Sequence, residues 1–133
     1  MRTVLLDTVG IIALWEETDQ WHGAAEQAMA ALGAAPTRLI TTSIILLECG
    51  NAASRKPYRA DVPLLRRKLI DDGRLIIPTE SDVEKAWNDY LRGNAGDAGV
   101  VDHISFVVMR RLGVTDAFTN DRHFKAAGFN TLF

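Results

Sequence analysis

Cysteine is almost missing from this sequence, since Cys49 is the only one in 133 residues. One thiol cannot form an internal disulfide, and no Cys-x-x-Cys pair or Cys/His spacing is present that would hold a structural zinc ion. We therefore expect a protein of a reducing compartment, the cytoplasm. Cys49 itself is expected to be a small buried apolar residue.

Long hydrophobic runs are also missing. No apolar stretch approaches the roughly 20 residues that a transmembrane helix needs. The N-terminal run of Val4, Leu5 and Leu6 is interrupted by Asp7, and acidic residues follow where a signal peptide would have its cleavage site. We expect neither a membrane span nor export.

Neither sign of charge dominates the composition. The chain has 15 Lys and Arg against 17 Asp and Glu, a formal net charge of -2, so bulk electrostatics does not indicate a nucleic-acid-binding protein. Hydrophobic residues make up 47% and charged residues 24%, as in folded globular proteins. The length is that of one compact domain, and we expect a single domain over residues 1–133.

Short apolar runs alternate with longer helix-like stretches along the chain. The runs predict strands at residues 4–6, 38–41, 74–77 and 115–119. Helical patterning covers residues 11–17, 20–32, 43–55, 62–70, 82–92, 101–112 and 122–127. The residues that follow helical segments and favour a left-handed closing conformation are Gly33, Gly73, Gly93 and Gly113. This alternation predicts an α/β fold with three layers, in which helices flank a mainly parallel central sheet.

Four acidic residues stand where a parallel sheet would bring them together, because ligands bind outside the carboxyl ends of such strands. Asp7 and Asp121 each stand between a predicted strand and a helix, whereas Glu48 and Asp102 lie on largely apolar helices. Each also has a structural explanation. Asp7 and Asp121 would cap the helices that follow them, Asp102 would suit the first turn of its helix, and Glu48 would pair with an arginine.

Four carboxylates in one crevice repel each other, so we expect them to surround a hard divalent cation. Mg²⁺ or Mn²⁺ suits ligation by oxygen alone, and it would activate a water molecule and neutralise charge that develops on a phosphoryl group. This is the chemistry of metal-dependent phosphodiester hydrolysis. Asp97 lies in a glycine-rich loop and is expected to be solvated, with a place at the rim of the site as the alternative.

These residues resemble the PIN-domain ribonucleases, in particular the VapC-like toxins of VapBC-type toxin–antitoxin pairs. Four motifs carry the resemblance, in the family's order: Leu6-Asp7-Thr8, Glu48-x-x-Asn51, Val101-Asp102-x-x-Ser105-Phe106 and Thr119-Asn120-Asp121-Arg122-His123-Phe124. The resemblance implies an endoribonuclease that depends on Mg²⁺ (or Mn²⁺). It implies that the catalytic, metal-binding residues are Asp7, Glu48, Asp102 and Asp121, and that the residues hydrogen-bonded to them are Thr8, Asn51, Ser105 and Thr119. It further implies a cognate antitoxin protein and a homodimer.

Two positions depart from the family pattern. Val9 stands where many members carry Asn or Ser, and its side chain cannot hydrogen-bond. Ala98 and Gly99 replace a Trp-Ser pair that is common among related sequences, which leaves the start of the following helix more flexible. Neither change removes a carboxylate.

A ribonuclease also needs cations that bind the phosphate backbone. The most basic window is residues 55–68, and the residues expected to contact RNA are Arg55, Lys56 and Arg59 in this window and Arg122 beside Asp121. A solvated helix face is an equal explanation for Arg66, Arg67 and Lys68. His123 also adjoins Asp121 and would be able to reach phosphate. Trp15 and Trp21 are expected to pack in the core or in an interface.

Two other classes of function remain open at this point. One is a PIN-like module that binds protein or RNA without activity, although four retained acidic residues argue against it. The other is a phosphoryl-transfer α/β domain, as in receiver domains or in phosphatases that use an aspartate nucleophile. Those phosphatases carry Asp-x-Asp after the first strand, and Val9 occupies the third position here.

Overall fold

The central feature of the fold is a sheet of five parallel strands in the order β3-β2-β1-β4-β5. The computed structural model describes residues 1–133. The strands are β1 (Arg2–Leu6), β2 (Thr37–Thr42), β3 (Leu75–Ile76), β4 (Asp116–Phe118) and β5 (Asn130–Thr131). The helices are α1 (Thr8–Trp15), α2 (His22–Leu32), α3 (Ser43–Ala53), α4 (Asp61–Asp71), α5 (Glu80–Leu91), α6 (Val100–Leu112) and α7 (Arg122–Ala126). The predicted α/β fold with a parallel sheet is confirmed.

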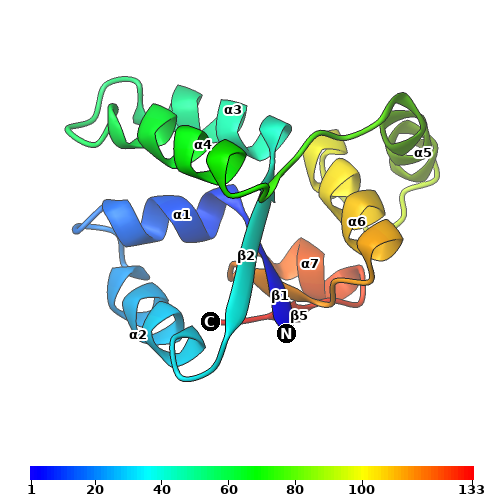
Figure 1. Ribbon diagram of the computed structural model, residues 1–133. Helices are drawn as coiled ribbons and strands as arrows, with labels where there is room; N and C mark the ends of the chain where they lie inside the picture. Colours follow the sequence, from blue (N-terminus) through cyan, green and yellow to red (C-terminus); the bar gives the residue numbers. More distant parts are fainter.

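Helices cover the sheet on both sides. In the view of Figure 1, α1 and α2 lie on one side of β2, α5 and α6 lie on the other, and α3 and α4 lie above the upper end of that strand. This upper end is the carboxyl end of β2, since the chain passes from β2 directly into α3. No helix combines the length and the apolar character that crossing a bilayer requires.

Besides shifts of one to three residues at the ends of several elements, two features of the secondary structure differ from the sequence prediction. The strand β5 was not expected, and it adds two residues to the edge of the sheet beside β4. Gly33 does not adopt the left-handed conformation, because its φ of -72° continues the right-handed turn and its N–H donates to Ala30 and Ala31. Gly73, Gly93 and Gly113 do adopt it, with φ values of 67°, 69° and 70°.

The buried strand β1 sets the position of the residues that follow it. Val4, Leu5 and Leu6 are buried on both faces of the sheet, as in parallel sheets covered by helices. Leu6 pairs with Phe118 of β4, so the next residue of each strand, Asp7 and Thr119, lies at the same carboxyl edge.

The helix α1 approaches β4 closely through Gly10. The backbone N–H of Asp7 donates to the carbonyl oxygen of Phe118 at 3.3 Å, at the point where β1 passes into α1. A Cβ atom at Gly10 would overlap both this carbonyl oxygen and the Phe118 ring. Glycine is therefore required here for close packing.

We predict that Gly10→Ala lowers the free energy of unfolding by about 2 to 3 kcal/mol, because the backbone of β4 has to move. Gly23→Ala in α2 is the matched control, since a Cβ there meets no atom within 4 Å. The control is expected to leave stability unchanged or to raise it by up to about 1 kcal/mol. Urea denaturation of both variants measures the difference, and equal midpoints would contradict this account of Gly10.

Candidate active site

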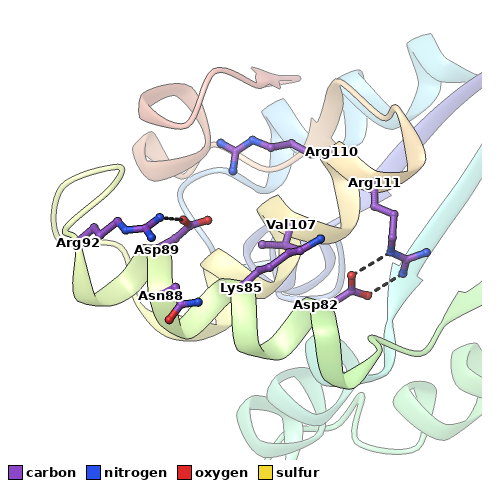
Figure 2. A pocket seen from close by; sticks show the side chains of 8 residues that line it. All are labelled: Asp82, Lys85, Asn88, Asp89, Arg92, Val107, Arg110 and Arg111. Carbon is purple, nitrogen blue, oxygen red and sulfur yellow. Dashed lines mark hydrogen bonds and ion pairs between the residues drawn. The ribbon is translucent and has the colours of Figure 1, made fainter.

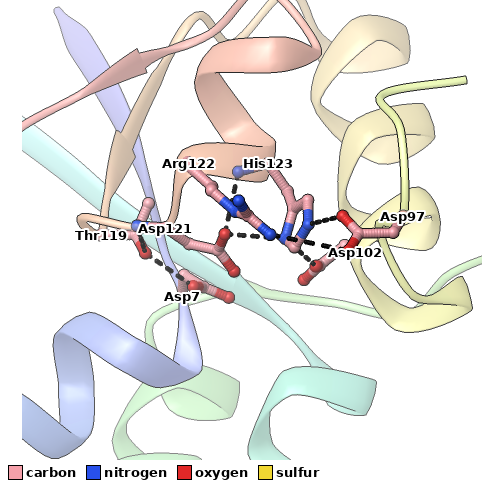
Figure 3. Close-up of polar contacts among 7 residues, drawn as sticks. All are labelled: Asp7, Asp97, Asp102, Thr119, Asp121, Arg122 and His123. Carbon is pink, nitrogen blue, oxygen red and sulfur yellow. Dashed lines mark hydrogen bonds and ion pairs between the residues drawn. The ribbon is translucent and has the colours of Figure 1, made fainter.

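Seven residues from four parts of the chain line one pocket of about 500 Å³ at the carboxyl edge of the sheet. They are Asp7, Thr8, Val9, Glu48, Asn51, Asp102 and Asp121. Asp7 follows β1 directly, Asp121 precedes α7, Glu48 lies on α3, and Asp102 lies in the first turn of α6. The structure thus brings together the four carboxylates selected from the sequence, and Figure 3 shows three of them with their polar neighbours.

The side chain of Asp7 is directed to the site and does not cap α1. Asp7 occupies the N-cap position, but its carboxylate accepts no hydrogen bond from the backbone of the helix. Instead Oδ2 accepts from the hydroxyl of Thr119 at 2.8 Å, and the same hydroxyl accepts from the backbone N–H of Asp121 at 3.1 Å. Thr119 therefore links the two strand ends, and the capping explanation of Asp7 is wrong.

Glu48 has no arginine partner. Its Oε1 accepts from the hydroxyl of Thr8 at 2.7 Å, and no ion pair reaches its carboxylate. The helix that carries it is anchored at its start by Thr42, whose hydroxyl accepts from the N–H of Ile45 at 3.1 Å. The expected alternative, a salt bridge to arginine, is wrong.

Asp121 has two roles at once. Its Oδ1 caps α7 by accepting from the backbone N–H of His123 at 2.9 Å, so the predicted cap is present. The same side chain lines the pocket beside Asp7 and Asp102. The capping bond therefore also fixes the orientation of this carboxylate toward the other acids.

The electrostatics of the pocket favour a bound cation. Burial, aided by the charges of Asp102 and Asp121 and opposed by the Thr119 hydrogen bond, raises the pKa of the Asp7 carboxyl to about 7. Burial also raises the pKa of Asp102 to about 6, with Asp121 and Glu48 adding to the effect. No lysine or arginine pairs with any of the four carboxylates; His123 is the only basic residue within ion-pair distance. A hard divalent cation would supply the missing positive charge, so these residues fit Mg²⁺ or Mn²⁺.

His123 and Asp97 form a network beside the carboxylates that the sequence did not show. His123 Nδ1 lies 2.9 Å from Asp121 Oδ1 and 3.7 Å from Asp102 Oδ2, and Nε2 lies 2.7 Å from Asp97 Oδ1 (Figure 3). The hydrogen bond to Asp97, followed by the nearby carboxylates, raises the pKa of His123. Ligand atoms of His123, Asp102 and Asp121 all lie within 4.8 Å of one another, which is close enough for one metal ion. Asp97 is 79% exposed and occupies the rim.

Comparison with known proteins agrees with this geometry. A model of the PIN domain family matches residues 4–130. The chain belongs to the PIN-domain family. It is 31% identical over 127 residues to the 23S rRNA-specific endonuclease VapC20 of Mycobacterium tuberculosis, a match that covers 95% of each protein. The resemblance inferred from the four motifs is confirmed.

Solved structures agree as well. The crystal structure of Mycobacterium tuberculosis VapC20, described as a sarcin–ricin loop cleaving toxin, matches with a TM-score of 0.79 and 27% identity over 95% of both chains. FitAcB from Neisseria gonorrhoeae matches with a TM-score of 0.65 and 16% identity, covering 98% of this chain and 96% of the other. The second match shows a shared fold alone.

Other predicted residues of the PIN domain lie outside the pocket. Ser105 is buried on α6 and does not line it. Lys56 pairs with Glu16 at 2.7 Å, and Arg122 lies 3.6 Å from Asp97, so both cations are partly neutralised. Arg55 and Arg59 are exposed in the turns between α3 and α4. The RNA contacts of these four basic residues remain predictions.

The tryptophans and the cysteine have structural surroundings. Trp15 packs against the ring of Tyr58 with centroids 5.8 Å apart, as expected for a core aromatic residue. Trp21 precedes α2 at the surface and is 45% exposed, so it lies outside the core, and its expected alternative place in an interface remains a prediction. Cys49 is buried in the main core and free.

We predict that Asp7→Asn stabilises the metal-free protein. The native pKa of Asp7 lies near 7 against an ordinary value of 3.8, so the folded state binds more protons between these values and the free energy of unfolding falls as pH rises from 4 to 7. Removing the charge should raise this free energy by about 1 to 3 kcal/mol at pH 8, with a smaller gain at pH 5. Thermal or urea unfolding in EDTA measures the effect.

The matched control is Asp71→Asn, because Asp71 is exposed and forms no ion pair. It should change stability by less than about 0.5 kcal/mol at either pH. If Asp7→Asn were less stable than the wild type at pH 8, the prediction would be wrong. Other groups of the protein would then already balance the charge of the Asp7 carboxylate.

Proposed function

We propose that this PIN domain is a divalent-metal-dependent endoribonuclease and acts as the toxin of a type II toxin–antitoxin pair. The observation that carries the proposal is one pocket in which four carboxylates from β1, α3, α6 and the end of β4 meet without a lysine or arginine. The similarity to VapC20 over nearly the whole of both chains supports it.

In this proposal Asp7, Glu48, Asp102 and Asp121 hold Mg²⁺ or Mn²⁺. The ion, when bound, supplies an activated water and charge stabilisation at the phosphate. Thr119 and Thr8 hold the Asp7 and Glu48 carboxylates in place by hydrogen bonds of 2.8 and 2.7 Å, and the cap of α7 does the same for Asp121. Hydrogen-bond partners of this kind orient metal ligands, and their substitution commonly lowers metal affinity or activity by about 10- to 100-fold.

The proposed substrate is RNA, and ribosomal RNA is the first candidate. The relative VapC20 is described as specific for 23S rRNA, and the chains align over 95% of their lengths. The pocket is polar, with Val9 as its one hydrophobic lining residue, as suits a phosphodiester rather than an apolar substrate.

We predict that purified protein cleaves RNA in Mg²⁺ or Mn²⁺ and that EDTA abolishes the cleavage. Asp7→Asn and Asp102→Asn should each reduce the rate at least about 100-fold, because each removes a metal-binding charge while the fold is retained. The assay uses total RNA, isolated ribosomal RNA and end-labelled fragments, with Asp71→Asn as the control that keeps activity.

Two outcomes would contradict the proposal in different ways. Cleavage that persists in EDTA would rule out the metal mechanism. No cleavage of any RNA, together with a melting temperature that rises in Mg²⁺ for the wild type but not for Asp7→Asn, would leave a metal-binding module without nuclease activity.

The toxin role predicts growth arrest on expression in a bacterial host. Asp102→Asn should abolish the arrest while its expression level stays equal, since the effect requires cleavage. A protein that co-purifies with the wild type and restores growth when co-expressed would be the proposed antitoxin. Arrest by both forms would contradict a role through RNA cleavage.

We also propose that the protein is a homodimer. Light scattering of the purified protein measures its mass in solution and checks this.

A further inference from the structure

A second polar groove of about 610 Å³ lies between α5 and α6, outside the carboxylate pocket. Its lining residues, drawn in Figure 2, are Asp82, Lys85, Asn88, Asp89, Arg92, Val107, Arg110 and Arg111. Val107 is the one hydrophobic residue among them. The chemistry of the groove therefore suits a charged ligand and not an apolar one.

Positive charge is in excess in this groove. The Arg111 guanidinium binds both oxygens of the buried Asp82 carboxylate, at 2.9 and 2.7 Å, so these two charges cancel (Figure 2). Asp89 is the only other acid, and it faces Arg92 at 3.8 Å. Lys85 and Arg110 have no acidic partner within ion-pair distance, which leaves an anion site with two free cations.

Arg110 is held in position without being neutralised. One of its terminal nitrogens donates to the carbonyl of Ala127 at 3.0 Å, and its guanidinium carbon lies 5.3 Å from the centre of the Phe129 ring. A guanidinium has five N–H donors, so several remain for a ligand. An arginine oriented in this way loses little freedom when it binds a phosphate oxygen.

The groove and the carboxylate pocket adjoin the same segments. The chain between α5 and α6 carries Asn94, which donates to Asp89 of the groove at 3.1 Å, and Asp97, which contacts His123. The helix α7 is preceded by Asp121, which lines the pocket, and followed by Ala127, whose carbonyl oxygen accepts the bond from Arg110. The α5–α6 loop and α7 thus connect the groove to the edge of the pocket, on the side where an RNA strand would leave it.

A smaller cavity of about 340 Å³ adjoins the groove. It shares Asp89 and Arg110 with the groove and is also lined by Asn94 and His103. The Nε2 atom of His103 is buried and has no hydrogen-bond partner. A buried nitrogen without a partner is unfavourable, and a hydroxyl group of a bound ligand, which can donate or accept, would satisfy it in either tautomer of the ring.

We propose that the α5–α6 groove binds the phosphate backbone of the RNA substrate outside the cleaved bond. This rests on the proposed ribonuclease function. An acidic protein segment is the competing occupant, but the free donors of Arg110, and the α5–α6 loop and helix α7 that each reach from the groove to residues beside the carboxylate pocket, favour a polyphosphate chain. Longer RNA would thus bind at two surfaces of the protein.

The test compares two substrates that share one cleavage site. One is a fragment of about 5 nucleotides that covers only the carboxylate pocket, and the other is an RNA of about 20 nucleotides that reaches the groove. The variants are Lys85→Gln and Lys85→Gln/Arg110→Gln, since these are the two cations of the groove without an acidic partner and both residues are exposed. Arg38→Gln is the matched control, because Arg38 is exposed near the amino end of β2 and lines neither the groove nor the carboxylate pocket.

For the longer RNA, we expect Lys85→Gln to raise KM by about fivefold and the double variant to raise it further, with kcat unchanged. The slope of log affinity against log salt should fall by about 0.7 for each cation removed. The short fragment should be cleaved equally by all variants. The proposal would be overturned if the groove variants had the same KM for the longer RNA as Arg38→Gln. It would also be overturned if their KM rose equally for both substrates.

A binding assay separates this proposal from the ribonuclease function. If the wild type cleaves no RNA, fluorescence anisotropy of the labelled longer RNA in EDTA still compares the variants. Weaker binding by the groove variants than by Arg38→Gln supports the groove as an RNA site. Unchanged RNA affinity overturns it. Polyglutamate, a probe for an acidic protein segment, is tested in the same assay, and if the groove variants lose affinity for polyglutamate alone, the groove binds an acidic protein.

Discussion

The pairing of β1 with β4 is the constraint on which the candidate site depends. Leu6 lies opposite Phe118, and the N–H of Asp7 bonds to the Phe118 carbonyl, so the two strands end together. Thr119 then stands where its hydroxyl can bind both the Asp7 carboxylate and the backbone of Asp121. A shift of one residue in this register would turn Asp7 to the other face of the sheet and separate it from Asp121.

The sequence predicted the parts of the site that depend on local order along the chain. An acid directly after a buried strand, as at Asp7, is visible without knowing any long-range contact, because the carboxyl edge of a parallel sheet is common to all its strands. Glu48 was recognisable for a different reason, since a carboxylate on an apolar helix requires a partner. The hydroxyl of Thr8 and the pocket now account for it.

Features that depend on contacts between distant segments were not predictable. The two residues of β5 form a strand only because the edge of β4 is available to them. Asp97 and His123 are brought together by the chain between α5 and α6, whose path the sequence pattern does not determine. The cations of the α5–α6 groove are likewise divided between two helices, so no window of the sequence shows them as a cluster.

The helix α5 is joined to the rest of the protein mainly through α6. Ala86 of α5 packs with Ile104, Val107 and Val108 in a small core separate from the main one, and the bond between Asp82 and Arg111 fixes the two helices together. Residues on the outer surface of α5 thus contact neither β1 nor the four carboxylates. An exposed side chain of α5 can therefore be replaced without disturbing the carboxylates, so the proposed contacts to the RNA backbone and the chemistry of cleavage reside on structurally separate parts of the fold.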